Sequence, residues 1–174
     1  NYENEKLITE KQYINMIRLK TATLIGFSLE LGGILSKMKN LDIKNLYRFG
    51  EFIGIGFQLQ DDYLDVFGDK KFGKKIGGDI LLNKKTYLLI KLLESTNEKE
   101  KIIINNWINN SNNPKQKIEA ITNLMKEKNI DSITESVIND YFNKAFDYLK
   151  RIDIKNSKKN ELIEFSKNLI NRKN

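Results

Sequence analysis

The chain has 174 residues, of which 40% are hydrophobic and 30% are charged, and its formal net charge is +7. It contains no cysteine and no histidine, which excludes disulfides, thiol chemistry, and imidazole as a general base or zinc ligand. Catalysis would therefore rely on carboxylates, lysines, hydroxyls, backbone groups and a metal ion. A single proline among 174 residues favours an all-α fold. No apolar run reaches the roughly 18 residues that span a bilayer, so we expect no membrane insertion and a cytoplasmic protein.

The first predicted helix runs from about residue 10 to 38. Thr9 and Gln12 have the spacing of a capping box at its start, and the apolar positions that follow recur at helical spacing. Lys20 lies among these apolar positions. From spacing alone, Lys20 either extends its amine to the surface or binds an anion.

The second predicted helix begins at Asp42 or Asn45 and ends near Phe67, and it carries three acids within five residues, Asp61, Asp62 and Asp65. At helical spacing Asp61 and Asp65 share one face, and Gln58 lies one turn earlier on the same side. Carboxylates this close repel one another unless a cation lies among them. A divalent metal such as Mg²⁺, shared with phosphate oxygens of a substrate, would remove that repulsion. The alternative is a solvated acidic face, but the apolar flanks of this helix disfavour it.

A loop rich in glycine and lysine follows the acidic helix, with glycines at 68, 73, 77 and 78. Glycine lets the backbone approach a ligand closely, and lysine ammonium groups suit a phosphate or diphosphate. The lysines concerned are Lys74, Lys75 and Lys84. A loop of this kind is by itself more often a basic surface turn, so its position directly after the acidic helix carries the inference.

The remainder of the chain is predicted to be helical scaffold within one domain, residues 1–174. Asn113 and Pro114 are typical of a cap and a first helical turn, and Ser132 with Glu135 predicts another capping box. The helices are expected at about 84–93, 98–109, 114–128, 133–152 and 158–170. Arg172 lies in a basic terminus that follows the last of them.

Three segments together resemble the trans-polyprenyl diphosphate synthases, which include the farnesyl and geranylgeranyl diphosphate synthases. The segments are Tyr13-x-x-Met16-Ile17-x-x-Lys20-Thr21-Ala22, then Phe57-Gln58-x-x-Asp61-Asp62-x-x-Asp65, and finally Gly73-Lys74-x-x-Gly77-x-Asp79 with Lys84-x-Thr86-Tyr87. They are similar to the family's Lys-Thr segment, its second aspartate-rich motif and the loop after that motif. The resemblance implies the C-terminal half of an isoprenoid synthase type I helical bundle around a central cavity.

The resemblance also implies a role for each matching residue. Asp61, Asp62 and Asp65 would hold Mg²⁺ against a diphosphate, and Gln58 and Thr21 would border the allylic cation. The lysines would bind substrate diphosphate, with Lys20 and Thr21 at a kink in their helix and with either Lys74 or Lys75 serving as the ligand from the loop. Lys84 is a further diphosphate ligand and Arg172 a weaker candidate. The implied reaction joins isopentenyl diphosphate to an allylic diphosphate, and the implied assembly is a homodimer.

The family's first aspartate-rich motif has no counterpart in this sequence, because Asp-Asp occurs only at Asp61 and Asp62. We therefore expect a fragment that holds about half of an active site, lacks activity by itself and leaves apolar surface exposed. The alternatives are a terpene cyclase or squalene-synthase-like enzyme, a non-catalytic subunit that modulates a partner synthase, and a nucleic-acid-binding module. The last is disfavoured because the lysines are dispersed among many acids.

Overall fold

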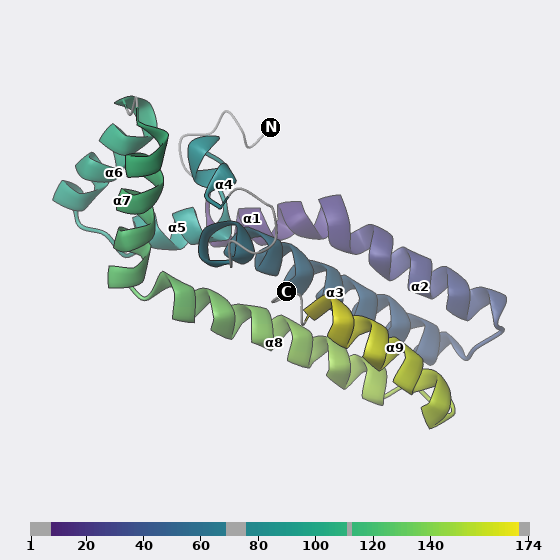
Figure 1. Ribbon diagram of the computed structural model, residues 1–174. Helices are drawn as coiled ribbons and strands as arrows, with labels where there is room; N and C mark the ends of the chain where they lie inside the picture. The colour runs from purple at the N-terminus through teal and green to yellow at the C-terminus, as the bar shows by residue number, and fades with distance from the viewer. Residues whose placement is uncertain (1–7, 69–75, 111–112, 171–174) are drawn as a thin grey trace. The chain divides into compact units, whose positions relative to one another are not determined.

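The computed structural model describes residues 8–68, 76–110 and 113–170, and every regular element in these ranges is a helix (Figure 1). The prediction of an all-α fold is therefore confirmed. The chain divides into two compact units. The first unit comprises residues 1–13 and 61–135, and the second unit comprises 14–60 and 136–174. In the described ranges, no helix is both long and apolar enough to cross a bilayer.

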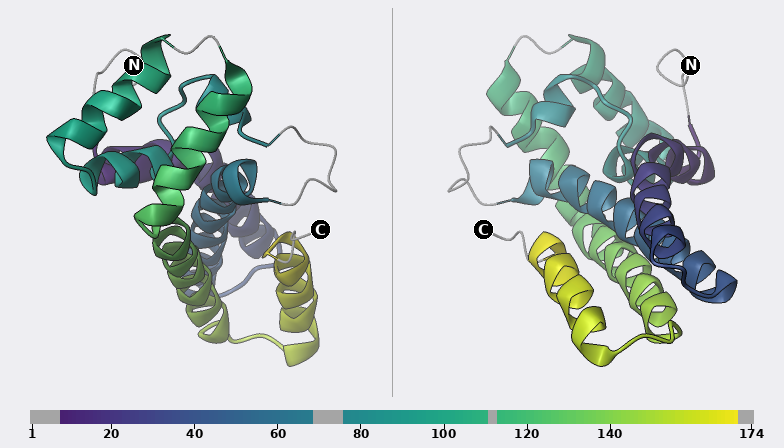
Figure 2. Two further views of the ribbon diagram at one scale, coloured as in Figure 1. Left: turned by 60° about the vertical axis from the view of Figure 1, so that its left-hand side comes forward. Right: turned by 90° about the vertical axis from the view of Figure 1, so that its right-hand side faces the viewer.

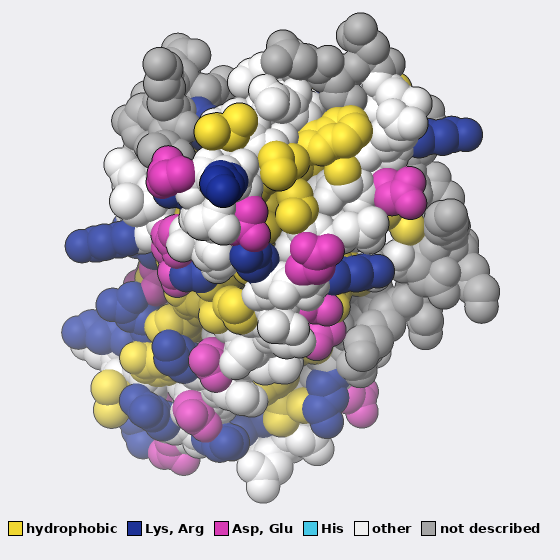
Figure 3. All heavy atoms as spheres, turned by 90° about the vertical axis from the view of Figure 1, so that its left-hand side faces the viewer, with side chains coloured by type: hydrophobic (Ala, Val, Ile, Leu, Met, Phe, Trp, Pro, Cys, Tyr) yellow, Lys and Arg dark blue, Asp and Glu magenta, His cyan; other side chains and the backbone are white. Residues whose placement is uncertain are grey.

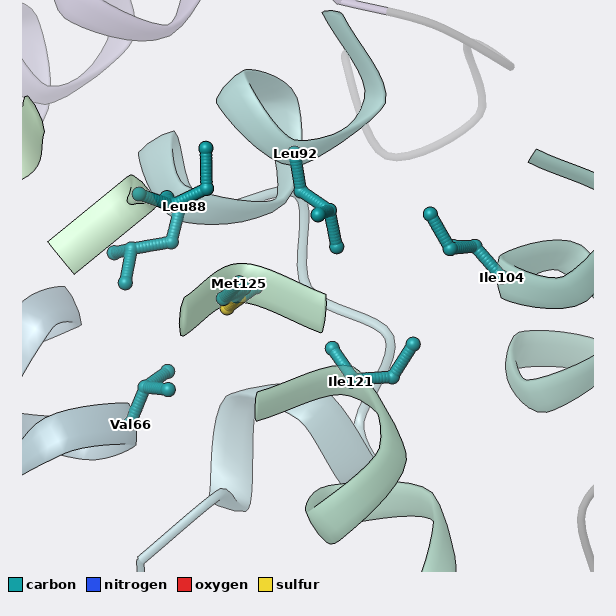
Figure 4. Packing of buried hydrophobic residues seen from close by; sticks show 7 residues of the cluster. Val66, Leu88, Leu92, Ile104, Ile121 and Met125 are labelled. Atoms are coloured by element: carbon teal, nitrogen blue, oxygen red, sulfur yellow. The ribbon is translucent and has the colours of Figure 1, made fainter. Parts of the chain in front are cut away.

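The first unit has its core among four helices that follow the acidic segment, namely α4 (Gly78–Leu81), α5 (Tyr87–Glu94), α6 (Glu98–Asn110) and α7 (Pro114–Glu127). Helix α7 contacts α4, α5 and α6, and α6 and α7 lie side by side (Figure 1). The buried apolar cluster at their centre is shown in Figure 4 and consists of Val66, Leu88, Leu92, Ile104, Ile121, Met125 and Ile130. One member of this core, Val66, immediately follows Asp65 in the sequence, so the end of the acidic segment is anchored in the core.

The second unit contains α2 (Thr23–Leu35), α9 (Asn156–Ile170) and most of α3 (Asn40–Phe67) and α8 (Ile130–Lys150). Helix α9 runs antiparallel beside α8 (Figure 2). Helices α2 and α3 approach so closely that a Cβ atom on Gly50 would lie 2.9 Å from the Cα of Gly26. The absence of side chains at Gly26 and Gly50 therefore permits close packing of these two helices.

The helix predicted over residues 10–38 is divided into three parts. It starts as α1 (Glu10–Ile17), passes through the π-helical segment η2 (Arg18–Ala22) and continues as α2. The predicted capping box is present at its start, since the Gln12 amide donates to Thr9 Oγ1 at 3.2 Å and the Thr9 amide donates to Gln12 Oε1 at 2.8 Å.

Several predicted boundaries were wrong. Helix α3 starts at Asn40 and α8 at Ile130, both earlier than expected. The capping box at Ser132 and Glu135 does not form, because Asn129 adopts a φ of 54° and α8 begins directly after it. Helix α4 was not predicted, and α5 begins at Tyr87, with the Thr86 hydroxyl accepting from the Leu89 amide as its cap. The cap of α7 at Asn113 is confirmed by a hydrogen bond from the Gln116 amide.

Helix α2 leaves one apolar side uncovered in the described structure. Its exposed residues recur at helical spacing and comprise Leu24, Phe27, Leu31, Ile34 and Leu35. This agrees with the expectation that apolar surface would be exposed. On the face seen in Figure 3, basic and acidic side chains are interspersed. That distribution on this face is unlike the basic stripe of a nucleic-acid-binding module.

Candidate active site

The three predicted metal ligands lie on the last two turns of α3. Asp62 is buried, whereas Asp61 and Asp65 are half-buried. The Tyr13 hydroxyl on α1 donates a hydrogen bond to Asp62 Oδ2 within the first unit. Burial raises the pKa of Tyr13, and the negative charge of Asp62 raises it further. Tyr13 therefore stays protonated and acts as a fixed donor to this carboxylate.

Asp65 is held by the backbone that follows the loop. Its side-chain Oδ2 accepts the Asp79 amide at 2.9 Å, and its carbonyl oxygen accepts the Gly77 amide at 2.6 Å. Gly77 has a φ of 82°, and a Cβ atom there would lie 2.7 Å from Ile118. Only glycine suits this position, because it combines a left-handed backbone with a close neighbour.

Lys84 lies beside the same acids. Its Nζ atom forms an ion pair with Asp79 Oδ1 at 2.6 Å. The hydrogen bond with Asp79 raises the pKa of Lys84, and the charges of Asp79, Asp65 and Asp62 add to the effect. The side chain is 57% exposed, so its ammonium group is fully charged and within reach of a ligand in solvent.

The acids do not form a closed metal cage. Within the described ranges, no three acidic side chains come together closely enough to hold a metal ion on their own. Their chemistry nevertheless fits Mg²⁺, which usually takes one or two protein carboxylates and completes its octahedron with water and substrate phosphate. Carboxylate oxygens held next to a lysine are suited to a metal that arrives with an anionic substrate.

In the second unit, Lys20 and Thr21 lie inside the π-helical segment η2. The backbone here makes a bond of the π type, since the Thr23 amide donates to the Arg18 carbonyl, and the Thr23 hydroxyl donates to the same oxygen at 2.9 Å. The regular α-helical hydrogen bonding is therefore interrupted at the position where a kink was expected. Lys20 is exposed, which agrees with either of the two interpretations of its position. Single π-helical turns are frequent at functional sites.

Thr21 and Gln58 are brought together by packing of η2 against α3. The Thr21 hydroxyl donates to Gln58 Oε1 at 3.2 Å. The approach depends on Gly54, because a Cβ atom at that position would lie 2.6 Å from the Cα of Ala22. The close approach at Gly54 thus allows two side chains that lie 37 residues apart in the sequence to form a hydrogen bond.

Three predicted ligands, Lys74, Lys75 and Arg172, lie outside the described residues. Two residues of the acidic cluster received no role from the sequence. The spacing predicted Tyr13 only as an apolar helix position, and Asp79 only as part of a motif. Tyr13 could have been singled out only because it lies seven residues before Lys20 in the same segment. Its partner Asp62 lies 49 residues away in the sequence, so the spacing did not reveal this contact.

Comparison with known proteins places these residues in a family context. The profile of the polyprenyl synthetase family matches residues 1–125. The chain belongs to this family. A geranylgeranyl diphosphate synthase of Saccharolobus solfataricus is 33% identical over 166 residues, which are 95% of this chain and 50% of that protein.

Solved structures of the family agree with the fold. A crystal structure of geranylgeranyl pyrophosphate synthase matches with a TM-score of 0.89 and 33% identity, and covers 99% of this chain and 54% of that one. The geranylgeranyl pyrophosphate synthetase of Pyrococcus horikoshii matches with a TM-score of 0.86 and 29% identity, over 98% of this chain and 52% of that one. This member of the family therefore spans about half the length of the relatives that it matches.

Proposed function

We propose that the complete protein is a prenyltransferase that joins isopentenyl diphosphate to an allylic diphosphate and releases a longer trans-polyprenyl diphosphate. The observation that carries the proposal is the acidic cluster of the first unit in a chain of the polyprenyl synthetase family. Asp62 and Asp65 are each held by a donor, and Lys84 lies beside them on Asp79. A site that combines fixed acids with an exposed lysine suits a metal-bound diphosphate.

In the proposed reaction the bond between the allylic carbon and its diphosphate breaks. Lys84 and Lys20 donate hydrogen bonds to the departing diphosphate, together with Lys74 or Lys75 from the loop. Each well-placed donor to developing negative charge contributes about 3 kcal/mol to the transition state. The double bond of isopentenyl diphosphate then attacks the allylic cation, and a proton passes to the released diphosphate. Thr21 and Gln58 border the cation without attacking it.

Asp61, Asp62 and Asp65 are the residues that would hold Mg²⁺. When bound, the ion neutralises charge on the diphosphate. The Tyr13 hydroxyl and the Asp79 amide fix the directions of the Asp62 and Asp65 carboxylates. Assembly as a homodimer, which the family resemblance implies, and the cytoplasmic location expected from the sequence are proposed with the activity.

The 174 residues supply about half of such a site, so we propose that they act with a second group of acids and lysines outside them. The exposed apolar side of α2 supports this, because folded proteins rarely expose a contiguous apolar patch unless a partner covers it. We expect this chain alone to show no turnover. Product formation by the chain alone would refute that statement and leave the proposed reaction intact.

The test is elongation of labelled isopentenyl diphosphate with dimethylallyl, geranyl and farnesyl diphosphates, with and without Mg²⁺. It uses the complete protein beside an Asp61→Ala, Asp62→Ala double variant and an Asp140→Ala control, which removes an exposed acid of α8. We expect the double variant to lose at least about a hundredfold in kcat and the control to match the parent. A folded complete protein that does not elongate any of the three substrates would refute the proposal.

The main alternative is a helical subunit without catalysis of its own that modulates a partner synthase. The retention of all three aspartates disfavours it, since such a subunit has no use for a held diphosphate site. The two functions give different results when Asp61 and Asp62 are changed in the complete protein. The subunit would still stimulate its partner, whereas the enzyme would lose elongation.

A further inference from the structure

Lys117 is a charged residue buried in the scaffold of the first unit. It lies on α7 and is only 6% exposed, on the same helix as the core residues Ile121 and Met125. Its Nζ atom donates to Asn83 Oδ1 at 2.5 Å and to the Ile108 carbonyl at 3.4 Å. Burial lowers the pKa of Lys117, because the apolar surroundings disfavour its charged form. The proposed reaction gives this lysine no role.

Asn83 is the residue at which the turn after α4 reverses the chain. It adopts a left-handed backbone with a φ of 54°, and its amide donates to the Ile80 carbonyl at 3.2 Å. Its side-chain Nδ2 donates to the Ile108 carbonyl at 3.2 Å. The Asn83 side chain is therefore held on both sides, by the ammonium group of Lys117 and by the end of α6.

The next residue is Lys84, whose amide donates to the Asp79 carbonyl at 2.9 Å and whose ammonium group pairs with the Asp79 side chain. Lys84, Asn83 and Lys117 line one pocket of the first unit. A long and exposed side chain gains precision from a fixed backbone, because a shift of about 1 Å at a reacting group can lower the rate a hundredfold.

We propose that Lys117 is a positioning residue for diphosphate binding, which acts by holding Asn83 and thereby the turn that presents Lys84. The proposal rests on the proposed function for its consequence, and on contacts within the first unit for its geometry. It assigns to the scaffold helices α6 and α7 a part in the site that their sequence does not indicate.

The melting temperature does not by itself separate a structural role from a positioning role, because methionine at this position leaves Asn83 Oδ1 and the Ile108 carbonyl without the donor that Lys117 provides. Methionine has nearly the same helix propensity as lysine, so helix formation in α7 is little affected. A purely structural role predicts that Lys117→Met lowers the melting temperature and leaves diphosphate binding unchanged. A positioning role predicts a looser turn together with weaker diphosphate binding.

The experiment compares Lys117→Met, Asn83→Gly and the double variant in the complete protein. Glycine adopts the left-handed backbone of Asn83 without its side chain, so Asn83→Gly removes the side-chain contacts with Lys117 and with the Ile108 carbonyl and keeps the backbone turn. Lys126→Met, an exposed lysine on the same helix, is the control for the lost charge. Hydrogen exchange of the Asn83 and Lys84 amides reports the turn, and calorimetry with inorganic diphosphate and Mg²⁺ reports the site.

We expect Lys117→Met to lose protection at these two amides and to bind diphosphate about tenfold more weakly, as for other residues that orient a ligand-binding group. Asn83→Gly should do the same, and the effects should be less than additive in the double variant because both changes remove the contact between Lys117 and Asn83. The Lys126→Met control should match the parent in both measurements.

Unchanged protection in Lys117→Met would overturn the proposal, as would weaker binding that is additive in the double variant. Loss of protection with unchanged diphosphate binding would also overturn it, since the turn would then not serve the site. A parent protein that binds no diphosphate would refute the proposed function, whereas the exchange data would still decide whether Lys117 holds the turn.

Discussion

The candidate residues of the first unit and those of the second unit differ in how firmly hydrogen bonds fix their side chains before a ligand binds. In the first unit, the acids are held in advance, with Tyr13 on Asp62 and the Asp79 amide on Asp65. In the second unit, Thr21 has a partner in Gln58, but Lys20 of the same segment is exposed to solvent.

The difference follows from the charges concerned. Neighbouring carboxylates repel one another and are costly to bury, so each needs donors that keep it ionised and directed. A single lysine in solvent is neither repelled by a neighbouring like charge nor desolvated, so it needs no fixed partner before an anion binds. We therefore expect substitutions in the acidic cluster to change both stability and binding, and substitutions at Lys20 to change binding alone.

The largest effect on stability is expected for Tyr13→Phe. The change removes the hydroxyl that donates to buried Asp62, and a buried charged group that loses a donor costs about 3 kcal/mol of unfolding free energy. Chemical denaturation measures this value, and Tyr47→Phe, at a half-buried tyrosine, should change it by less than about 0.5 kcal/mol. If both variants unfold alike, the hydroxyl does not hold Asp62 and the comparison between the units fails.

Next in size is Gly54→Ala, which tests how the second unit brings Thr21 to Gln58. The added Cβ atom would lie 2.6 Å from the backbone of Ala22, and overpacking of this kind costs about 2 kcal/mol. Gly32→Ala is the matched control because nothing lies within 4 Å of its added atom, and it should be neutral or slightly stabilising. Equal stability of the two variants, measured by chemical denaturation, would contradict the packing of η2 on α3.

A smaller effect is expected for Thr21→Val. The variant loses one partly buried hydrogen bond at 3.2 Å, which is worth about 1 kcal/mol. Gln58→Leu should cost a similar amount, and the double variant should cost less than the sum, because both changes remove one interaction. Strict additivity in denaturation experiments would show that the two side chains do not interact in solution.

Local signals in the sequence predicted much of the fold and part of the site. Thr9 with Gln12 and Asn113 with Pro114 were interpreted correctly, because a cap involves residues only a few positions apart. The box at Ser132 and Glu135 was wrong, since Glu135 instead accepts the Tyr63 hydroxyl at 2.6 Å from 72 residues away. The residue type of Asn129 was the local signal for the start of α8, because asparagine tolerates the left-handed backbone that it adopts there.

The contacts that organise the site could not be predicted in the same way. Tyr13 with Asp62 and Lys117 with Asn83 join residues 49 and 34 positions apart. Nothing in the spacing of either pair distinguishes it from core or surface residues, because such contacts are set by tertiary packing. The residue types needed for the chemistry could thus be read from the motifs, whereas the residues that hold them required the structure.

The smallest effect on stability and the sharpest test of the comparison is Lys20→Met. Lys20 is exposed within η2, so its replacement should change the unfolding free energy by less than about 0.5 kcal/mol. Binding of inorganic diphosphate with Mg²⁺, measured by calorimetry on the complete protein, should nevertheless weaken about tenfold, because a charge-assisted hydrogen bond contributes about 1.5 to 3 kcal/mol. The exposed lysine Lys11 on α1 provides the control as Lys11→Met, which should change neither quantity. Unchanged binding in Lys20→Met would make Lys20 a surface lysine of a π-helical segment without a part in the site, and would leave the acidic cluster as the part of the chain that supports the proposed function.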